Sequence, residues 1–174
     1  ELGHYMAAVY YKWRIDYIML WVFGGVMKTD ETSYRPVKEE LIVTLAGPLQ
    51  HVFIYLLLLF IGLFQVIPEQ LIEQVHYYNI ILLLFNLLPI YPLDGGKLLL
   101  LCYSAFTAYY ASLRTTYLFS ILCCSLVLIT HLSFYPFTWS AFALSLFLLL
   151  ENVRAWKDLF FFFILNGTAS RYLG

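Results

Sequence analysis

The stretch Asn86-Leu-Leu-Pro-Ile-Tyr-Pro-Leu-Asp-Gly-Gly96 ends an apolar run with one acid, two prolines and two glycines. A carboxylate at membrane depth costs about 2.5 to 3.5 kcal/mol on insertion scales, so Asp94 is expected to face a cavity, a cation or a partner instead of lipid. Pro89 and Pro92 end regular helix, and irregular backbone is tolerated at that depth only where protein or water surrounds it. The stretch therefore predicts a binding site inside a membrane protein.

The composition of the chain is that of a membrane protein. Of its 174 residues, 62% are apolar and 12% are charged, whereas soluble domains average about 45 to 50% apolar and about 25% charged residues. At about 20 residues for each span, the length predicts an all-α polytopic membrane protein with about five spans and no large soluble domain. The lipid bilayer is the expected surrounding, and the net charge of −1 gives no indication of a nucleic-acid partner.

Apolar segments alternate with short connections along the chain. The end of a helix is expected over residues 1–11, followed by a small β-hairpin at the membrane surface within residues 13–29, where β-branched and aromatic residues flank Gly24-Gly25. The remaining spans are expected at residues 41–64, 77–90, 117–130 and 139–150.

All ten Lys and Arg residues fall on one side of the membrane with these spans. The two opposite loops, 65–76 and 131–138, contain none. The positive-inside rule then assigns the basic side and the C-terminus to the cytoplasm.

Two kinds of role are expected for histidines outside the chemical motifs. His51 is predicted to hydrogen-bond between packed helices, whereas His76 and His131 are predicted to lie in loops on the side without basic residues.

Glu1-Leu-Gly-His4 is the second chemical clue. In a His-Glu-x-x-His helix, two histidines four residues apart share a face and bind zinc, while the glutamate activates water. Glu1 and His4 match the last four positions of this pattern, whose first His would precede the chain. A zinc hydrolase needs three protein ligands and an open position, and Asp94 can supply the third. Gly95 and Gly96 are expected to let backbone approach the metal or a substrate closely.

Three separated motifs together resemble those of the site-2 proteases, the intramembrane zinc metalloproteases. They are, in order, Glu1-Leu-Gly-His4, Ala46-Gly-Pro48 and the stretch from Asn86 to Gly96. Within that family the chain is most similar to the branch that acts in sporulation, which shares Phe23-Gly-Gly25, Arg35-Pro36 and Pro92-Leu-Asp-Gly-Gly-Lys97. The resemblance is strong over about residues 1–100 and rests on hydropathy beyond them.

The resemblance implies a zinc endopeptidase of a bacterial cell membrane. Its expected substrate is a membrane-associated regulatory protein, a pro-form of a sigma factor in sporulation, cleaved near the cytoplasmic face, and inhibitory membrane partners are expected as well. Glu1 is implied as the catalytic base, with His4 and Asp94 as Zn²⁺ ligands. Asn86 is expected to hydrogen-bond the substrate backbone or a developing oxyanion. An edge of the hairpin could pair with an extended substrate strand. Further substrate contacts are expected at Gly24, Gly25, Pro92 and Gly95.

The chain is expected to form one intramembrane metalloprotease domain over residues 1–174, beginning within the zinc motif and carrying no CBS or PDZ domain. With only two of three ligands it is expected to be inactive alone, and activity is predicted for the intact protein. Two alternatives stay open: a non-catalytic relative that binds partners, and a cation-coupled transporter in which Asp94 and the broken helix hold the cation. The residue before Glu1 separates protease from pseudoenzyme, because only His completes the motif.

Overall fold

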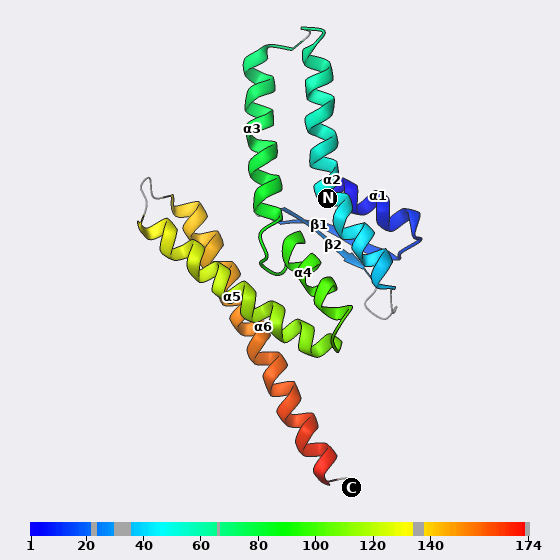
Figure 1. Cartoon of the computed structure of the whole chain (residues 1–174), viewed down its shortest axis with the longest axis vertical. Helices are drawn as coiled ribbons and strands as arrows, with labels where there is room; N and C mark the ends of the chain where they lie inside the picture. The colour runs from blue at the N-terminus through cyan, green and yellow to red at the C-terminus, as the bar shows by residue number, and fades with distance from the viewer. Residues whose placement is uncertain (22–23, 30–35, 66, 134–137, 173–174) are drawn as a thin grey trace.

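The computed structural model describes residues 1–21, 24–29, 36–65, 67–133 and 138–172. The elements in chain order are α1 (Leu2–Tyr10), β1 (Ile15–Trp21), β2 (Gly24–Thr29), α2 (Val37–Gly62), α3 (Glu69–Asn86), α4 (Asp94–Ser104), α5 (Tyr109–Ser133) and α6 (Trp139–Tyr172). Figure 1 shows α2 with α3, and α5 with α6, as two helix pairs, with the short α4 between them. Helix α1 packs against α2, so the N-terminus lies near the middle of the assembly.

Two helices of the described chain, α2 and α5, are long and apolar enough to cross a membrane. The chain is mostly helical, as predicted, but the prediction of about five spans is wrong in number. Helices α1 and α4 have 9 and 11 residues, too few for a hydrocarbon layer of about 30 Å at about 1.5 Å per residue. Helix α3 has 18 residues but begins with polar turns, and α6 carries charged side chains midway, between Glu151 and Asp158.

The outer faces of α2 and α5 are those of helices in contact with lipid. Only 17% of the most apolar window of each helix is buried, and large side chains such as Phe53, Phe60 and Leu122 are exposed. A helix that is apolar on all sides is stable only inside protein or membrane. Because protein leaves these faces uncovered, a membrane is the environment that fits them.

Helix α3 begins at Glu69, eight residues before the predicted span. Pro68 precedes the first turn, and an acid in that turn is favourable at the positive end of the helix dipole. His76 therefore lies in α3, and its ring contacts that of Tyr55 on α2 with centroids 4.6 Å apart. The prediction that His76 lies in a loop is wrong, because the polar first turns of α3 have the composition of a connection.

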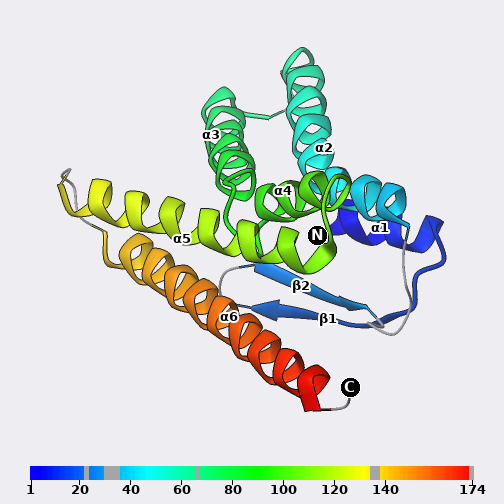
Figure 2. The ribbon, with the colours of Figure 1, turned by 60° about the horizontal axis from the view of Figure 1, so that its bottom comes forward.

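The segment between α1 and α2 contains two antiparallel strands. They pair from Ile15 with Thr29 to Trp21 with Gly24, and the register shifts near Ile15. Gly24 and Gly25, where the sequence predicted the turn, are instead the first two residues of β2. Residues 22–23 and 30–35 lie outside the described part of the chain. Figure 2 shows the strands below α1 and α4, apart from the α2–α3 pair. In this two-stranded sheet, each strand keeps one backbone edge that the other strand does not cover.

The core lies where α5, α6 and the connection from α3 to α4 meet. Ile90, Cys124 and Leu148 are buried together there. On α5, Ser112, Thr116 and Ser120 recur every four residues and are fully buried. Small side chains at this spacing let a neighbouring helix approach closely. The connection that leads to Asp94 is therefore anchored in this core through Ile90.

Candidate metal centre

His4 and Asp94 meet in the structure, although 90 residues separate them in sequence. His4 lies in the first turn of α1, and Asp94 is the first residue of α4. The Nε2 atom of His4 is 3.2 Å from Oδ2 of Asp94, and the two side chains are 12% and 10% exposed. The two residues that the sequence singled out as metal ligands thus form one nearly buried site.

The tautomer of the His4 ring follows from its second contact. Its Nδ1 lies 2.8 Å from the backbone oxygen of Val43, and because a carbonyl oxygen only accepts, Nδ1 carries the hydrogen. In the neutral ring Nε2 then presents a lone pair to Asp94, whose ionised carboxylate also only accepts.

Two acceptors 3.2 Å apart in a nearly buried site require a cation or a proton between them, because neither can satisfy the other. In histidine metal ligands, the ring nitrogen that does not bind the metal usually donates its hydrogen to a backbone oxygen or a carboxylate, as Nδ1 of His4 does here. Histidine nitrogen and carboxylate oxygen are donors that Zn²⁺ accepts. The chemistry of this pair therefore fits zinc.

Helix α2 forms the wall of the site at Gly47. A Cβ atom on Gly47 would collide with Nε2 of His4 and lie 3.0 Å from Oδ2 of Asp94. Gly47 is buried, and Pro48 inside the same helix lacks a backbone N–H. Only glycine leaves space for the two facing atoms.

Two further contacts hold α1 against α2. The N–H of Gly3 donates to Oε1 of Gln50 at 2.6 Å, which pairs one of the amides that a helix leaves unpaired at its N-terminus. A Cβ atom on Gly3 would collide with the backbone oxygen of Ala46. The helices thus touch at backbone level one residue before His4, so this contact sets how deeply His4 enters the site.

Gly95 and Gly96 serve the packing of the chain itself. A Cβ atom on Gly95 would collide with the carbonyl groups of Leu87 and Leu88, and one on Gly96 with the backbone of Ile90. The sequence predicted that these glycines clear space for a metal or a substrate. In the structure, the space beside both glycines is instead occupied by the backbone of the connection between α3 and α4, which folds back onto the start of α4.

Glu1 stands at the start of α1 and is exposed. Its backbone oxygen accepts from the N–H of Tyr5 at 2.9 Å, so helical hydrogen bonding begins at this residue. Residues three apart lie on one helix face. Glu1 is therefore on the same face of α1 as His4, about one turn nearer the N-terminus.

The remaining predicted site residues are distributed over α3, the following connection and β2. Asn86 is the last residue of α3 and is half-buried, whereas Pro92 is exposed. Gly24 and Gly25 begin β2, opposite Trp21 and Leu20 of β1.

His51 joins α2 to α3, as predicted. Its Nδ1 lies 2.7 Å from Oδ1 of Asn79, and Nδ2 of Asn79 donates to the backbone oxygen of His51 at 2.9 Å. This reciprocal pair explains the polar residue in an otherwise apolar span.

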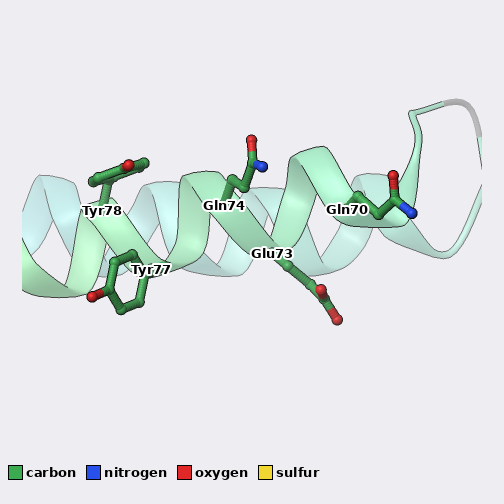
Figure 3. A pocket seen from close by; sticks show the side chains of 5 residues that line it. All are labelled: Gln70, Glu73, Gln74, Tyr77 and Tyr78. Atoms are coloured by element: carbon green, nitrogen blue, oxygen red, sulfur yellow. The ribbon is translucent and has the colours of Figure 1, made fainter.

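A shallow pocket lies on the first half of α3, lined by Gln70, Glu73, Gln74, Tyr77 and Tyr78 (Figure 3). It contains one carboxylate and neither His nor Cys. This lining lacks the donor set of a hydrolytic metal centre.

Val43, Gly47 and Gln50 belong to the site although the sequence assigned them no individual role. A glycine and a proline inside an apolar helix were a usable signal for Gly47. Val43 had none, because it acts through its backbone oxygen. Gln50 lies in the recognised motif, but its partner could not be read from spacing.

Comparisons with known proteins agree with this geometry. The model of Peptidase family M50 matches residues 1–77 and 65–130. Stage IV sporulation protein FB of Bacillus subtilis is 37% identical over 158 residues, which are 91% of this chain and 55% of that protein. A zinc metalloprotease of Methanocaldococcus jannaschii is 35% identical over 102 residues, which are 57% of this chain and 29% of that protein. The chain thus spans about half of the first relative and under a third of the second.

A solved structure shares the fold. The site-2 protease from Methanocaldococcus jannaschii has a TM-score of 0.68 and 27% sequence identity, covering 89% of this chain and 71% of that chain. Both His4 and Asp94 lie within the residues that the family model matches. On this evidence the chain belongs to Peptidase family M50, the family of the site-2 proteases.

Proposed function

We propose that the intact protein is an intramembrane zinc endopeptidase that cleaves a membrane-associated regulatory protein near the cytoplasmic face. One observation carries the proposal: Nε2 of His4 and Oδ2 of Asp94 face each other at 3.2 Å as two acceptors that need a cation or a proton between them, and both are donor types that Zn²⁺ accepts. Two relatives that carry the name zinc metalloprotease support the choice of metal.

A third protein ligand completes the proposed centre. Among the described residues, no group of three or more His, Cys, Asp or Glu side chains is placed to hold a metal. The His-Glu-x-x-His pattern assigns the missing ligand to the residue before Glu1. A histidine there would lie four residues before His4, on the same face of the helix.

When bound, Zn²⁺ supplies Lewis-acid chemistry that activates water and polarises the scissile carbonyl. Glu1, on the face of α1 that carries His4, accepts the proton of the attacking water and passes it to the leaving amine. His4 is held in the metal-binding tautomer by the Val43 backbone oxygen. Asn86 donates a hydrogen bond to the substrate backbone or to the developing oxyanion.

Substrate is proposed to bind as an extended strand. A peptide bond inside a helix is shielded by its own hydrogen bonds, so the substrate must unwind locally before attack. The edge of the β1–β2 sheet offers replacement backbone partners, and Gly24 and Gly25, at the start of β2, are proposed substrate contacts. Pro92, within the connection that leads to Asp94, and Gly95, the second residue of α4, are further proposed substrate contacts.

The proposed substrate follows from the similarity to a sporulation protein, and the proposed orientation in the membrane follows from the positions of the basic residues. Stage IV sporulation protein FB is a relative, so a membrane-associated pro-form of a sigma factor is the proposed substrate, with inhibitory membrane partners. With α2 and α5 as spans, eight of the ten basic residues, all but Lys97 and Arg114, fall on one side, and that side is proposed as cytoplasmic. The proposed location is a multi-pass protein of the bacterial cell membrane.

Chelation tests the proposal directly. The intact protein, reconstituted in lipid vesicles with a membrane-tethered pro-sigma factor, is expected to cleave it, and 1,10-phenanthroline is expected to stop cleavage. Adding Zn²⁺ back should restore the rate, because the ligands remain folded around the vacated position. Gel electrophoresis of the two products measures the outcome.

Two results would contradict the proposal. Cleavage that persists in chelator would remove zinc from the mechanism. Stoichiometric zinc without any cleavage of the tethered substrate would instead identify a non-catalytic relative.

Gly47→Ala is expected to damage the metal centre without unfolding α2. Its methyl group would displace the ring of His4 and crowd Asp94, and a displacement of about 1 Å in an active site can lower the rate about 100-fold. We expect cleavage to fall by about that factor and zinc binding to weaken about tenfold or more. Competition with a chromophoric chelator measures the zinc affinity.

Gly62→Ala is the matched control on the same helix. A Cβ atom there meets only Cδ1 of Ile72 at 3.5 Å, an ordinary contact. Its zinc affinity and cleavage rate should equal those of the unchanged protein. If both variants behave alike, the space at Gly47 has no role in the metal centre.

A further inference from the structure

The backbone of Tyr91 is held from two helices by polar side chains. Its N–H donates to Oγ of Ser120 on α5 at 2.9 Å, and its carbonyl oxygen accepts from Nδ2 of Asn152 on α6 at 2.6 Å. Tyr91 lies in the connection between α3 and α4, three residues before Asp94. Both polar groups of one peptide residue are therefore fixed by side chains from outside the metal centre.

The side chains of Ser120 and Asn152 are buried, and each makes a further hydrogen bond within its own helix. Ser120 and Asn152 are 0% and 2% exposed. The hydroxyl hydrogen of Ser120 is donated to the Thr116 backbone oxygen at 2.8 Å, which leaves the oxygen to accept from Tyr91. The second amide hydrogen of Asn152 is donated to the Leu148 backbone oxygen at 2.8 Å. Each side chain is thus braced by its own helix.

The clamped peptide is mechanically connected to Asp94. The neighbouring Ile90 is buried in the core, and its backbone lies against Gly96 so closely that no Cβ atom would fit. The N–H of Leu93 donates to the Ile90 oxygen at 2.8 Å. Between the clamp and Asp94 the chain therefore has little freedom to adjust.

We propose that Ser120 and Asn152 are positioning residues that fix Asp94 relative to His4 by clamping the Tyr91 backbone. The inference rests on the proposed zinc protease, and it extends the machinery to α5 and α6, which contribute nothing to the predicted ligand set. Outer-shell partners of metal ligands affect affinity by about 10- to 100-fold, so a clamp one step further out should act at the low end of that range.

Ser120→Ala is the test, and Ser125→Ala is its matched control. Both serines lie on α5 and donate to the backbone oxygen four residues earlier at 2.8 Å, but Ser120 also accepts from Tyr91. In the intact protein in detergent, Ser120→Ala should weaken zinc binding about tenfold and lower kcat by a similar factor with KM unchanged. Ser125→Ala should leave zinc affinity and kcat unchanged.

Hydrogen exchange of the segment 87–93, followed by mass spectrometry, reports on the clamp independently of activity. Loss of the acceptor in Ser120→Ala should accelerate exchange there several-fold, whereas Ser125→Ala should not. Asn152→Leu removes the other half of the clamp and decides the question if Ser120→Ala does not fold.

The outcomes separate the clamp from the proposed function. Faster exchange together with weaker zinc binding supports the proposal. Faster exchange with unchanged zinc affinity overturns the link to Asp94. Unchanged exchange in Ser120→Ala and in Asn152→Leu overturns the clamp itself. If the unchanged protein binds no zinc, the proposed function fails, yet the exchange of segment 87–93 still tests the clamp.

Discussion

Asp94→Asn is expected to remove zinc from the intact protein while leaving its fold in place. The NH₂ group of asparagine can take the position of Oδ2 and donate a hydrogen bond to Nε2 of His4. These two positions are 3.2 Å apart in the unchanged protein. The pair would then be satisfied without a cation. We expect zinc binding to weaken by at least about 100-fold, because losing even an outer-shell partner costs about 10- to 100-fold.

The same substitution should abolish cleavage and spare stability. Metal-free Asp94→Asn is expected to unfold at a temperature no lower than that of the metal-free unchanged protein, because the two facing acceptors no longer oppose each other. Asp94→Ala lacks the donor and leaves Nε2 of His4 without a partner in a nearly buried position, which costs about 1–3 kcal/mol. Zinc content by atomic emission and thermal unfolding by circular dichroism measure both effects.

Asp158→Asn is the control, because Asp158 is an exposed acid on α6. It should keep stoichiometric zinc and the full cleavage rate. Asp94→Asn protein that still carries stoichiometric zinc would remove Asp94 from the ligand set.

Glu1→Gln is expected to stop proteolysis without releasing the metal. Glutamine has nearly the same shape but cannot take a proton from water, and positioned acid–base groups contribute about 10²- to 10⁴-fold to rates. Cleavage of the tethered substrate should fall within that range. Zinc affinity should change little, because Glu1 is exposed and stands apart from the buried pair formed by His4 and Asp94.

The matched control for Glu1→Gln is Glu69→Gln. Both acids are exposed at the start of a helix, so a general effect of charge at a helix N-terminus would appear in both variants. Only Glu1→Gln should lose activity. Retained cleavage in Glu1→Gln would assign the base to another residue.

Local patterns account for what could be predicted of the fold. Composition alone indicates a membrane protein, and long uninterrupted runs such as α2 are readable because apolar length is a property of one segment. The count of spans failed at α1, whose nine residues resemble the end of a longer apolar helix, and at α3 and α6, where apolar residues share a helix with polar or charged turns. The start of α3 was missed because polar first turns resemble a loop.

The candidate site was predictable as residues but not as an arrangement. Glu1 and His4 could be paired by helical spacing, and Asp94 was conspicuous as an acid among apolar residues. Their roles in catalysis and metal binding stay predictions. Neither spacing nor composition could indicate that Gln50 caps α1 or that Asn152 reaches the connection before α4.

By itself the sequence determined the membrane environment, the two chemical half-sites and the family resemblance, because each depends on neighbours in one segment. Only the tertiary structure decided that His4 meets Asp94 across 90 positions, that the oxygen of Val43, 39 positions away, selects the ring tautomer, and that Gly47 provides the space. These features depend on how α1, α2 and α4 pack. Helix packing is set by the combined fit of many side chains, so no single motif encodes it.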